Sequence, residues 1–250
     1  MKKRSTTALL AALAVVAAGV FVSLFLSFSN QDPAHVITLP GQGSAVIDTA
    51  PEIEEENRQM MQQLTVNVSN VQAVIASLRR PENYQSQSEL TYFYRDTQHT
   101  VKNQLWKLGS RIRTCQLAED GSYAENAVLT DDWVYLWSGD SAYARFARQA
   151  QDGDLYSRTP TYEDLLQLNR TDILSVEVRD VDGRMCISVT SMDPMTGEQE
   201  NWCILVENGL LLYADGTLDG VPTYAYRMTE LQLEQPDEAL FLLPDGTVPQ

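Results

Sequence analysis

The chain has 250 residues, of which 44% are hydrophobic and 21% are charged, and its formal net charge at pH 7 is −16. A surface this acidic repels the phosphates of nucleic acids and anionic lipid headgroups, which argues against binding either one through a basic patch. The three cysteines are too few for a disulfide-built scaffold and lack the spacing of a metal site. Length and composition therefore indicate a globular domain joined to additional segments.

An uncharged apolar run occupies residues 8–28 and is preceded by three basic residues. At about 1.5 Å per residue it is long enough to cross a hydrocarbon core of about 30 Å. Because Asp32 is the first acidic residue, the positive-inside rule places the N-terminus in the cytoplasm. The pattern predicts a single-pass membrane anchor in residues 1–29, with the rest of the chain outside the cytoplasm. A cleaved signal peptide stays an alternative, because Ser27 and Ser29 form a −3/−1 arrangement of small residues.

Residues 30–50 are predicted to be a flexible linker, since prolines and glycines interrupt them and no apolar period is present. A helix is predicted next, with Thr49 and Glu52 as a capping box and Pro81 just after its end. Apolar residues at alternating spacings of three and four predict that one helical face packs against a sheet, or, as an alternative, forms a dimer seam. This stripe consists of Met61, Leu64, Val68, Val71, Ile75 and Leu78.

From Tyr84 onward the apolar period changes from that of a helix to that of a strand. Nine or ten short strands follow one another, separated by turns such as Asp182-Gly183 and Asn208-Gly209, with one short helix predicted at 162–168. This succession predicts one continuous antiparallel sheet. A sheet of so many strands curls instead of staying flat.

Two stretches carry a family resemblance: "DDWVYLWSGD" at 131–140 and "GLLLYADGTLDGVPTYAYRMTELQLEQPDEALFLLPDG" at 209–246. With the N-terminal helix and the meander before them, they make residues 68–246 resemble the outer-membrane lipoprotein-sorting family of periplasmic carriers, the LolA/LolB-like proteins and related regulators. The resemblance implies an α+β fold, a strongly curved antiparallel half-barrel with helices covering its concave face. It also implies an activity of holding acyl chains or an apolar peptide without chemistry. The predicted anchor departs from the soluble carriers and puts shuttling between membranes in doubt.

Aromatic residues recur at a spacing of two in three of the predicted strands, so each set shares one face of its strand. Such faces bind apolar ligands well, because each ring buries about 150–250 Å². Packing of the same rings as core is the alternative. The candidate ligand-binding residues are Tyr92, Tyr94, Trp106, Trp133, Tyr135, Trp137, Tyr224 and Tyr226.

Cys186 and Cys203 flank a turn at 193–197. Directly opposite positions would allow a disulfide, whereas a four-residue loop makes the pair diagonal, at about 7–8 Å, which is too far for a bridge. We therefore expect three unlinked thiols. His99 is the single histidine of the predicted folded part, and neither a nucleophile motif nor a phosphate-binding loop is present in the sequence.

The sequence thus predicts a domain at 51–250 that is not an enzyme and needs neither cofactor nor metal. We expect a membrane-anchored, extracytoplasmic binding protein that holds a lipid or lipoprotein acyl chain in the concave face of its sheet. The alternative is a sensory or regulatory module at the cell surface that recognises a protein partner with the same fold. A nucleic-acid partner is not expected.

Overall fold

The computed structural model describes residues 45–118, 121–139, 141–148 and 159–250. The apolar run at 8–28, on which the predicted anchor depends, lies outside these residues, as does most of the predicted linker. Within the described ranges, no helix is long and apolar enough to span a membrane.

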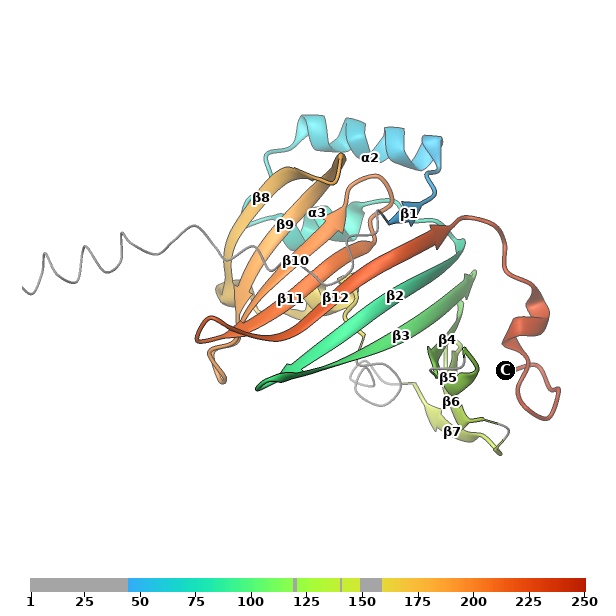
Figure 1. Cartoon of the computed structure of the whole chain (residues 1–250). Helices are drawn as coiled ribbons and strands as arrows, with labels where there is room; N and C mark the ends of the chain where they lie inside the picture. Colours follow the sequence, from blue (N-terminus) through green and yellow to red (C-terminus); the bar gives the residue numbers. More distant parts are fainter. Residues whose placement is uncertain (1–44, 119–120, 140, 149–158) are drawn as a thin grey trace, which may run out of the picture. The chain divides into compact units, whose positions relative to one another are not determined.

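A sheet of twelve strands dominates the described residues (Figure 1). Eleven strands follow the order β7-β6-β5-β4-β3-β2-β12-β11-β10-β9-β8, and neighbours in this order are antiparallel. The strands are β1 (Val46–Ile47), β2 (Asn83–Tyr94), β3 (Thr97–Leu108), β4 (Arg111–Leu117), β5 (Tyr123–Leu129), β6 (Trp133–Ser138), β7 (Ala144–Ala147), β8 (Ile173–Val181), β9 (Arg184–Met192), β10 (Gln199–Leu205), β11 (Leu211–Leu218) and β12 (Val221–Gln232).

The sheet is open and strongly twisted. In the described ranges β7 and β8 are its two edges and do not pair with each other, so it does not close into a barrel. In Figure 1, β2, β3 and β12 run across the page while β4 to β7 are seen nearly end-on. The predicted continuous antiparallel sheet is therefore confirmed, and an open curved sheet is consistent with the predicted half-barrel. The short β1 adds a parallel contact, pairing Val46 with Glu230 of β12.

Helices cover one face of the sheet at its β8–β12 end, and we call this face the helix side and the opposite one the back face. The helix layer consists of α2 (Pro51–Gln63), α3 (Val71–Ser77) and α5 (Tyr162–Gln167). In Figure 1, α2 crosses above the ends of β8 to β10. The helix predicted at 162–168 is confirmed by α5, whose N-cap Thr161 forms a capping box with Asp164.

The single long helix predicted after residue 50 is wrong, because the chain breaks between α2 and α3. The break contains β-branched residues with low helix propensity and an asparagine turn. In that turn the Asn67 Oδ1 accepts hydrogen bonds from the Ser69 amide at 2.8 Å and from its hydroxyl at 2.6 Å. The predicted capping box is also wrong: Ala50 is the N-cap of α2, without a side-chain hydrogen bond. As a result Leu64 is exposed, while Met61 and Ile75 are buried.

The chain ends in a C-terminal segment, residues 233–250, that packs on the back face of β3 to β6. It contains a 3-10 helix, Glu238–Phe241, whose Phe241 is fully buried against Trp106 and Cys115. Leu243 packs on Val128 and Tyr135 further along the segment. One part of the sheet is thus covered by helices on one face, and the other part by the C-terminal segment on the opposite face.

Candidate functional site

An apolar interface between the helix layer and the sheet is the largest hydrophobic cluster of the described residues. On the helix layer it includes Met61, Val74 and Leu165, and the sheet contributes long aliphatic and aromatic side chains from β8 to β12 and β2. We call this the helix-side cluster. Its buried members are Met61, Val71, Val74, Ile75, Leu78, Leu90, Leu165, Ile173, Ile187, Val189, Trp202, Ile204, Val206, Leu211, Ala214 and Tyr226.

Asn57 of α2 holds the helix layer to the end of β10 through three hydrogen bonds. Its Nδ2 donates to the carbonyl oxygens of Arg79 and Val206, both at 2.9 Å, and its Oδ1 accepts from the Arg79 amide at 2.7 Å. The side chain is buried, and it provides hydrogen-bond partners to backbone groups that would otherwise have none. Asn57 therefore joins three segments: its own helix α2, the residues that follow α3, and the end of β10.

Gln72 and Arg80 supply the other polar contacts of the helix layer. The Gln72 Nε2 donates to the carbonyl oxygens of Leu165, Leu166 and Leu168, and so joins α3 to the C-terminal end of α5. The last carbonyls of a helix lack the usual intrahelical donors, and Gln72 supplies a donor to them here.

Arg80 follows α3 and reaches the turn between β10 and β11. Its Nε donates to the Gly209 carbonyl at 2.9 Å, and its guanidinium lies 3.7 Å from the centre of the Tyr162 ring. Partial burial lowers the pKa of Arg80, yet an arginine stays charged at neutral pH. Gly209 has φ +68°, and a Cβ there would lie 3.0 Å from the Arg80 Cγ. The glycine of the predicted Asn-Gly turn thus makes room for the Arg80 side chain.

A polar row crosses the helix side at the level of Glu200. Pairing places Glu200 beside Gly216, Gly216 beside Tyr224, Tyr224 beside Tyr92, and Tyr92 beside His99. The Tyr224 hydroxyl donates to the Glu200 Oε1 at 3.0 Å, and burial raises the pKa of the Glu200 carboxyl.

The Tyr224 ring reaches Glu200 by crossing β11 over Gly216. A Cβ at that glycine would lie 2.6 Å from the Tyr224 Cε1 and 2.5 Å from both the Glu198 Oε1 and the Thr223 Oγ1. The missing side chain is therefore what lets the ring and the carboxylates meet.

The eight predicted ligand-binding residues divide between the two faces of the sheet. Pairing of Tyr224 with Tyr92 and of Tyr226 with Leu90 places these tyrosines on the helix side, with Tyr94 on the same face of β2. Trp106 pairs with Gln85, which puts it on the back face, and the register continues through Arg113 and Val128 to Tyr135. The back-face members are Trp106, Trp133, Tyr135 and Trp137.

Burial separates the same residues further. Trp106 and Tyr135, at 2% and 3% exposure, pack beneath the C-terminal segment, and Tyr226 at 6% belongs to the helix-side cluster. Tyr94 is 68% exposed, while the remaining four are half-buried. These eight side chains do not line one concavity. Tyr92, Tyr224 and Tyr226 adjoin the helix-covered interface, and their binding of a ligand stays a prediction.

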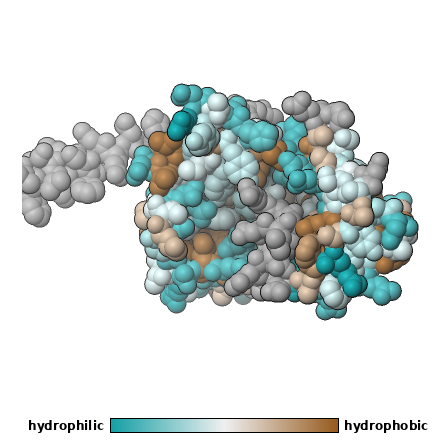
Figure 2. All heavy atoms as spheres, turned by 90° about the horizontal axis from the view of Figure 1, so that it is seen from below, coloured by the Kyte–Doolittle hydropathy of each residue, from teal (hydrophilic) through white to brown (hydrophobic). Residues whose placement is uncertain are grey.

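The helix-side cluster is packed in this structure. The two best-formed hollows among the described residues measure about 140 and 70 Å³, and both are lined mainly by polar side chains. Sites for drug-sized ligands measure about 300–1,000 Å³, so an acyl chain needs a rearrangement of the helix layer. On the face seen in Figure 2, hydrophobic residues outside the grey atoms form separate patches among hydrophilic ones.

The three cysteines are buried and unlinked. The register pairs Cys203 with Ser188 and Cys186 with Leu205, so the two cysteines are diagonal, as a four-residue loop predicted. Within the part of the chain that the structure describes, no group of three or more His, Cys, Asp or Glu side chains could hold a metal ion.

Sequence reasoning missed Asn57, Gln72 and Arg80 as the residues that hold the helix layer. Arg80 stands directly before Pro81 at the end of the predicted helix, and neither Asn57 nor Gln72 belongs to a recognisable motif. A polar residue beside an apolar stripe is the one available signal, and it does not identify a partner more than a hundred residues away, as Val206 is from Asn57.

No family model matches the chain, and no curated protein matches it. Among solved structures, an uncharacterized conserved protein from Thermus thermophilus is similar at 9% identity and a TM-score of 0.44, over 74% of this chain and 91% of that one. A LolA superfamily protein from Nitrosomonas europaea is similar at 10% identity and a TM-score of 0.35, over 71% and 98%. A chain of the MucA/MucB complex of Pseudomonas aeruginosa is similar at 14% identity and a TM-score of 0.37, over 62% and 53%. The LolA superfamily is the family that the sequence was found to resemble.

Proposed function

We propose that this protein is a non-catalytic binding protein that holds a lipid or a lipoprotein acyl chain between its helix layer and the helix side of its sheet. The observation that carries the proposal is the make-up of that interface. Its buried members are almost all apolar, and three polar residues, Asn57, Gln72 and Arg80, hold the helix layer through hydrogen bonds to backbone carbonyls. A cover of three short helices can separate from a sheet while the sheet keeps its own hydrogen bonds.

An acyl chain entering this interface replaces contacts between the helices and the sheet with contacts to itself. Both kinds of contact keep the apolar surface away from water, so the exchange is close to neutral in hydrophobic free energy. The same exchange would not suit a polar ligand, which would leave its hydrogen-bonding groups unpaired. This favours an apolar ligand for the helix-side cluster.

The proposed location is outside the cytoplasm, anchored by residues 8–28. The net charge of −16 and the apolar run support this location, since an acidic domain stays off an anionic membrane surface while its anchor holds it close. A bound acyl chain would then come from the membrane in which the protein is anchored.

The test is lipid extraction and mass spectrometry of the purified full-length chain. We expect a phospholipid or fatty acid to co-purify, and its amount to fall when Met61→Gln places a carboxamide in the helix-side cluster. Met192→Gln is the matched control, because Met192 is exposed on the back face. Lipid-free protein would contradict the proposal.

A second candidate function is recognition of a protein partner, and the packed state of the helix-side cluster favours it. A filled interior needs no ligand, and the surface of the sheet would then make the contact. Lipid-free protein that retains a partner from the cell envelope would support this second function.

A further inference from the structure

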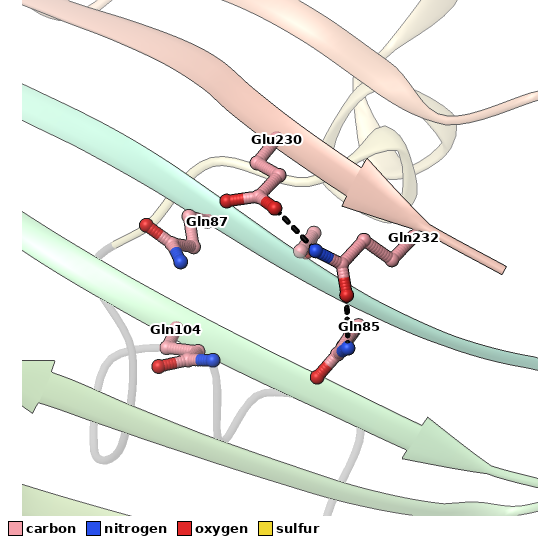
Figure 3. Close-up of a pocket in the computed structure, with 6 residues that line it drawn as sticks. Gln85, Gln87, Gln104, Glu230 and Gln232 are labelled. Carbon is pink, nitrogen blue, oxygen red and sulfur yellow. Dashed lines mark hydrogen bonds between the residues drawn. The ribbon is translucent and has the colours of Figure 1, made fainter. Parts of the chain in front are cut away.

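A polar hollow lies on the back face, where β12, β2 and β3 run side by side, and we call it the glutamine hollow. Its volume is about 140 Å³, and its lining is Gln85, Ser86, Gln87, Gln104, Glu230 and Gln232. Figure 3 shows the four glutamines and Glu230 converging from the three strands. Its lining residues are not part of the helix-side cluster, so its role is independent of the proposed lipid function.

A β-bulge in β12 creates this arrangement. Met228 pairs with Ser88 on the helix side, and the register then shifts so that Glu230 pairs with Gln87. Without the extra residue, Glu230 would follow Met228 on the helix side by simple alternation. The bulge instead turns Glu230 and Gln232 to the back face. Bulges that redirect side chains in this way are frequent beside binding and active sites.

Hydrogen bonds fix one side of the hollow. The Gln85 Nε2 donates to the Gln232 Oε1, and the Gln232 Nε2 donates to the Glu230 Oε1. Gln232 is therefore held, while the second Glu230 oxygen and the Gln85 Oε1 stay available as acceptors.

The opposite side is formed by Gln87 and Gln104, which are directly paired across β2 and β3. Within the described ranges, no hydrogen bond to either side-chain carboxamide is found. Gln87 is exposed and Gln104 is half-buried. Each carboxamide offers two donor hydrogens and an acceptor oxygen to a ligand that enters the hollow.

We propose that the glutamine hollow binds the hydroxyl groups of a neutral sugar ring. A hydroxyl both donates and accepts, so it satisfies the carboxamide donors and the acceptors of Glu230 and Gln85 together. An ammonium ion only donates, so it could bind the acceptors but could not use the Gln87 and Gln104 N–H donors, and an anion would meet the Glu230 carboxylate. At about 140 Å³ the hollow has room for several waters, or for one edge of a ring.

Saturation-transfer NMR on the full-length chain tests this, with glucose, galactose, N-acetylglucosamine and ethylammonium chloride as separate probes. We expect transfer to at least one sugar, and a loss of affinity of at least tenfold in the double variant Gln87→Ala/Gln104→Ala. Gln116→Ala is the matched control, because Gln116 pairs with Asn103 on the helix side. Its affinity should equal that of the unchanged chain.

Three results would overturn the proposal: no transfer to any of the sugars, transfer to ethylammonium alone, or sugar binding that persists in the double variant. Circular dichroism of each variant shows whether it is folded. If the double variant does not fold, Gln87→Ala alone takes its place, since that exposed side chain can be shortened without opening the core.

Discussion

The two parts of the sheet are covered in opposite ways. From β8 to β12 and β2 the cover is the helix layer, which lies on the helix side and is held by hydrogen bonds of Asn57, Gln72 and Arg80. From β3 to β6 the cover is the C-terminal segment, which lies on the back face and is inserted among aromatic rings. Its last residue is bound as well, since the Tyr135 hydroxyl donates to the Gln250 carbonyl at 3.0 Å.

This difference shows what alternation within a strand can predict. It predicts which side chains share a face, but it does not predict which segment of the chain packs on that face. The tyrosines of β2 and β12 and the tryptophans of β6 follow the same period of two. The first group meets helices and the second meets the C-terminal segment. We infer that the helix layer is the movable cover and that the C-terminal segment is a fixed part of the core.

The largest expected effect is that of Phe241→Ala in the C-terminal segment. Phe241 is fully buried against Trp106 and Cys115, so its removal should lower the free energy of unfolding by about 3–5 kcal/mol. Urea unfolding measures the loss. If this cover is fixed, the lipid bound per folded molecule should stay the same. A folded Phe241→Ala protein with empty lipid sites would mean that the C-terminal segment is the lipid-binding cover.

Ile75→Ala makes the matching change in the helix layer. Ile75 is also fully buried, and the expected loss is about 2–4 kcal/mol. In this variant, bound lipid should restore part of the lost free energy of unfolding, because a ligand that binds only the folded state adds to its stability. Thermal unfolding with and without added fatty acid measures this. Equal shifts in the unchanged chain, Ile75→Ala and Phe241→Ala would remove the distinction between the two covers.

Asn57→Ala should loosen the helix layer alone. The substitution leaves the carbonyls of Arg79 and Val206 without their partner, at a cost of about 1–3 kcal/mol. Hydrogen exchange should accelerate in α2 and α3 and stay unchanged in β4 to β6. Uniform acceleration across the sheet would show that the helix layer does not open independently.

Glu200→Gln should have the smallest effect and the opposite sign. Burial raises the pKa of the Glu200 carboxyl, so this group contributes stability below its unfolded pKa and loses it as the pH rises through the folded value. The amide keeps an acceptor for the Tyr224 hydroxyl and cannot ionise. We expect a midpoint of thermal unfolding about 1–3 °C higher at pH 7, with no gain at pH 4. A lower midpoint at pH 7 would show that the carboxylate is stabilising.

Much of the fold follows from the sequence because the strands depend on local alternation and turns. The Asp182-Gly183 and Asn208-Gly209 turns lie between β8 and β9 and between β10 and β11 as predicted. The break after α2 was missed because the apolar stripe continues through it, and β7 was missed because its four residues are all exposed and carry no period.

The candidate sites were less accessible to sequence reasoning. The face on which Tyr135 lies depends on the register of five strands, β2 to β6, and the glutamine hollow depends on a bulge in β12. Neither property leaves a local pattern, because both arise from pairing between segments distant in the chain.

Photo-crosslinking with a fatty acid that carries a diazirine on its acyl chain tests the central claim most directly. The full-length chain is labelled, digested and analysed by mass spectrometry. The account predicts labels on α2, α3 and α5 and on helix-side residues of β9 to β12, such as Ile204 and Tyr226. Labels confined to β4–β6 and the C-terminal segment, or no specific label, would contradict it.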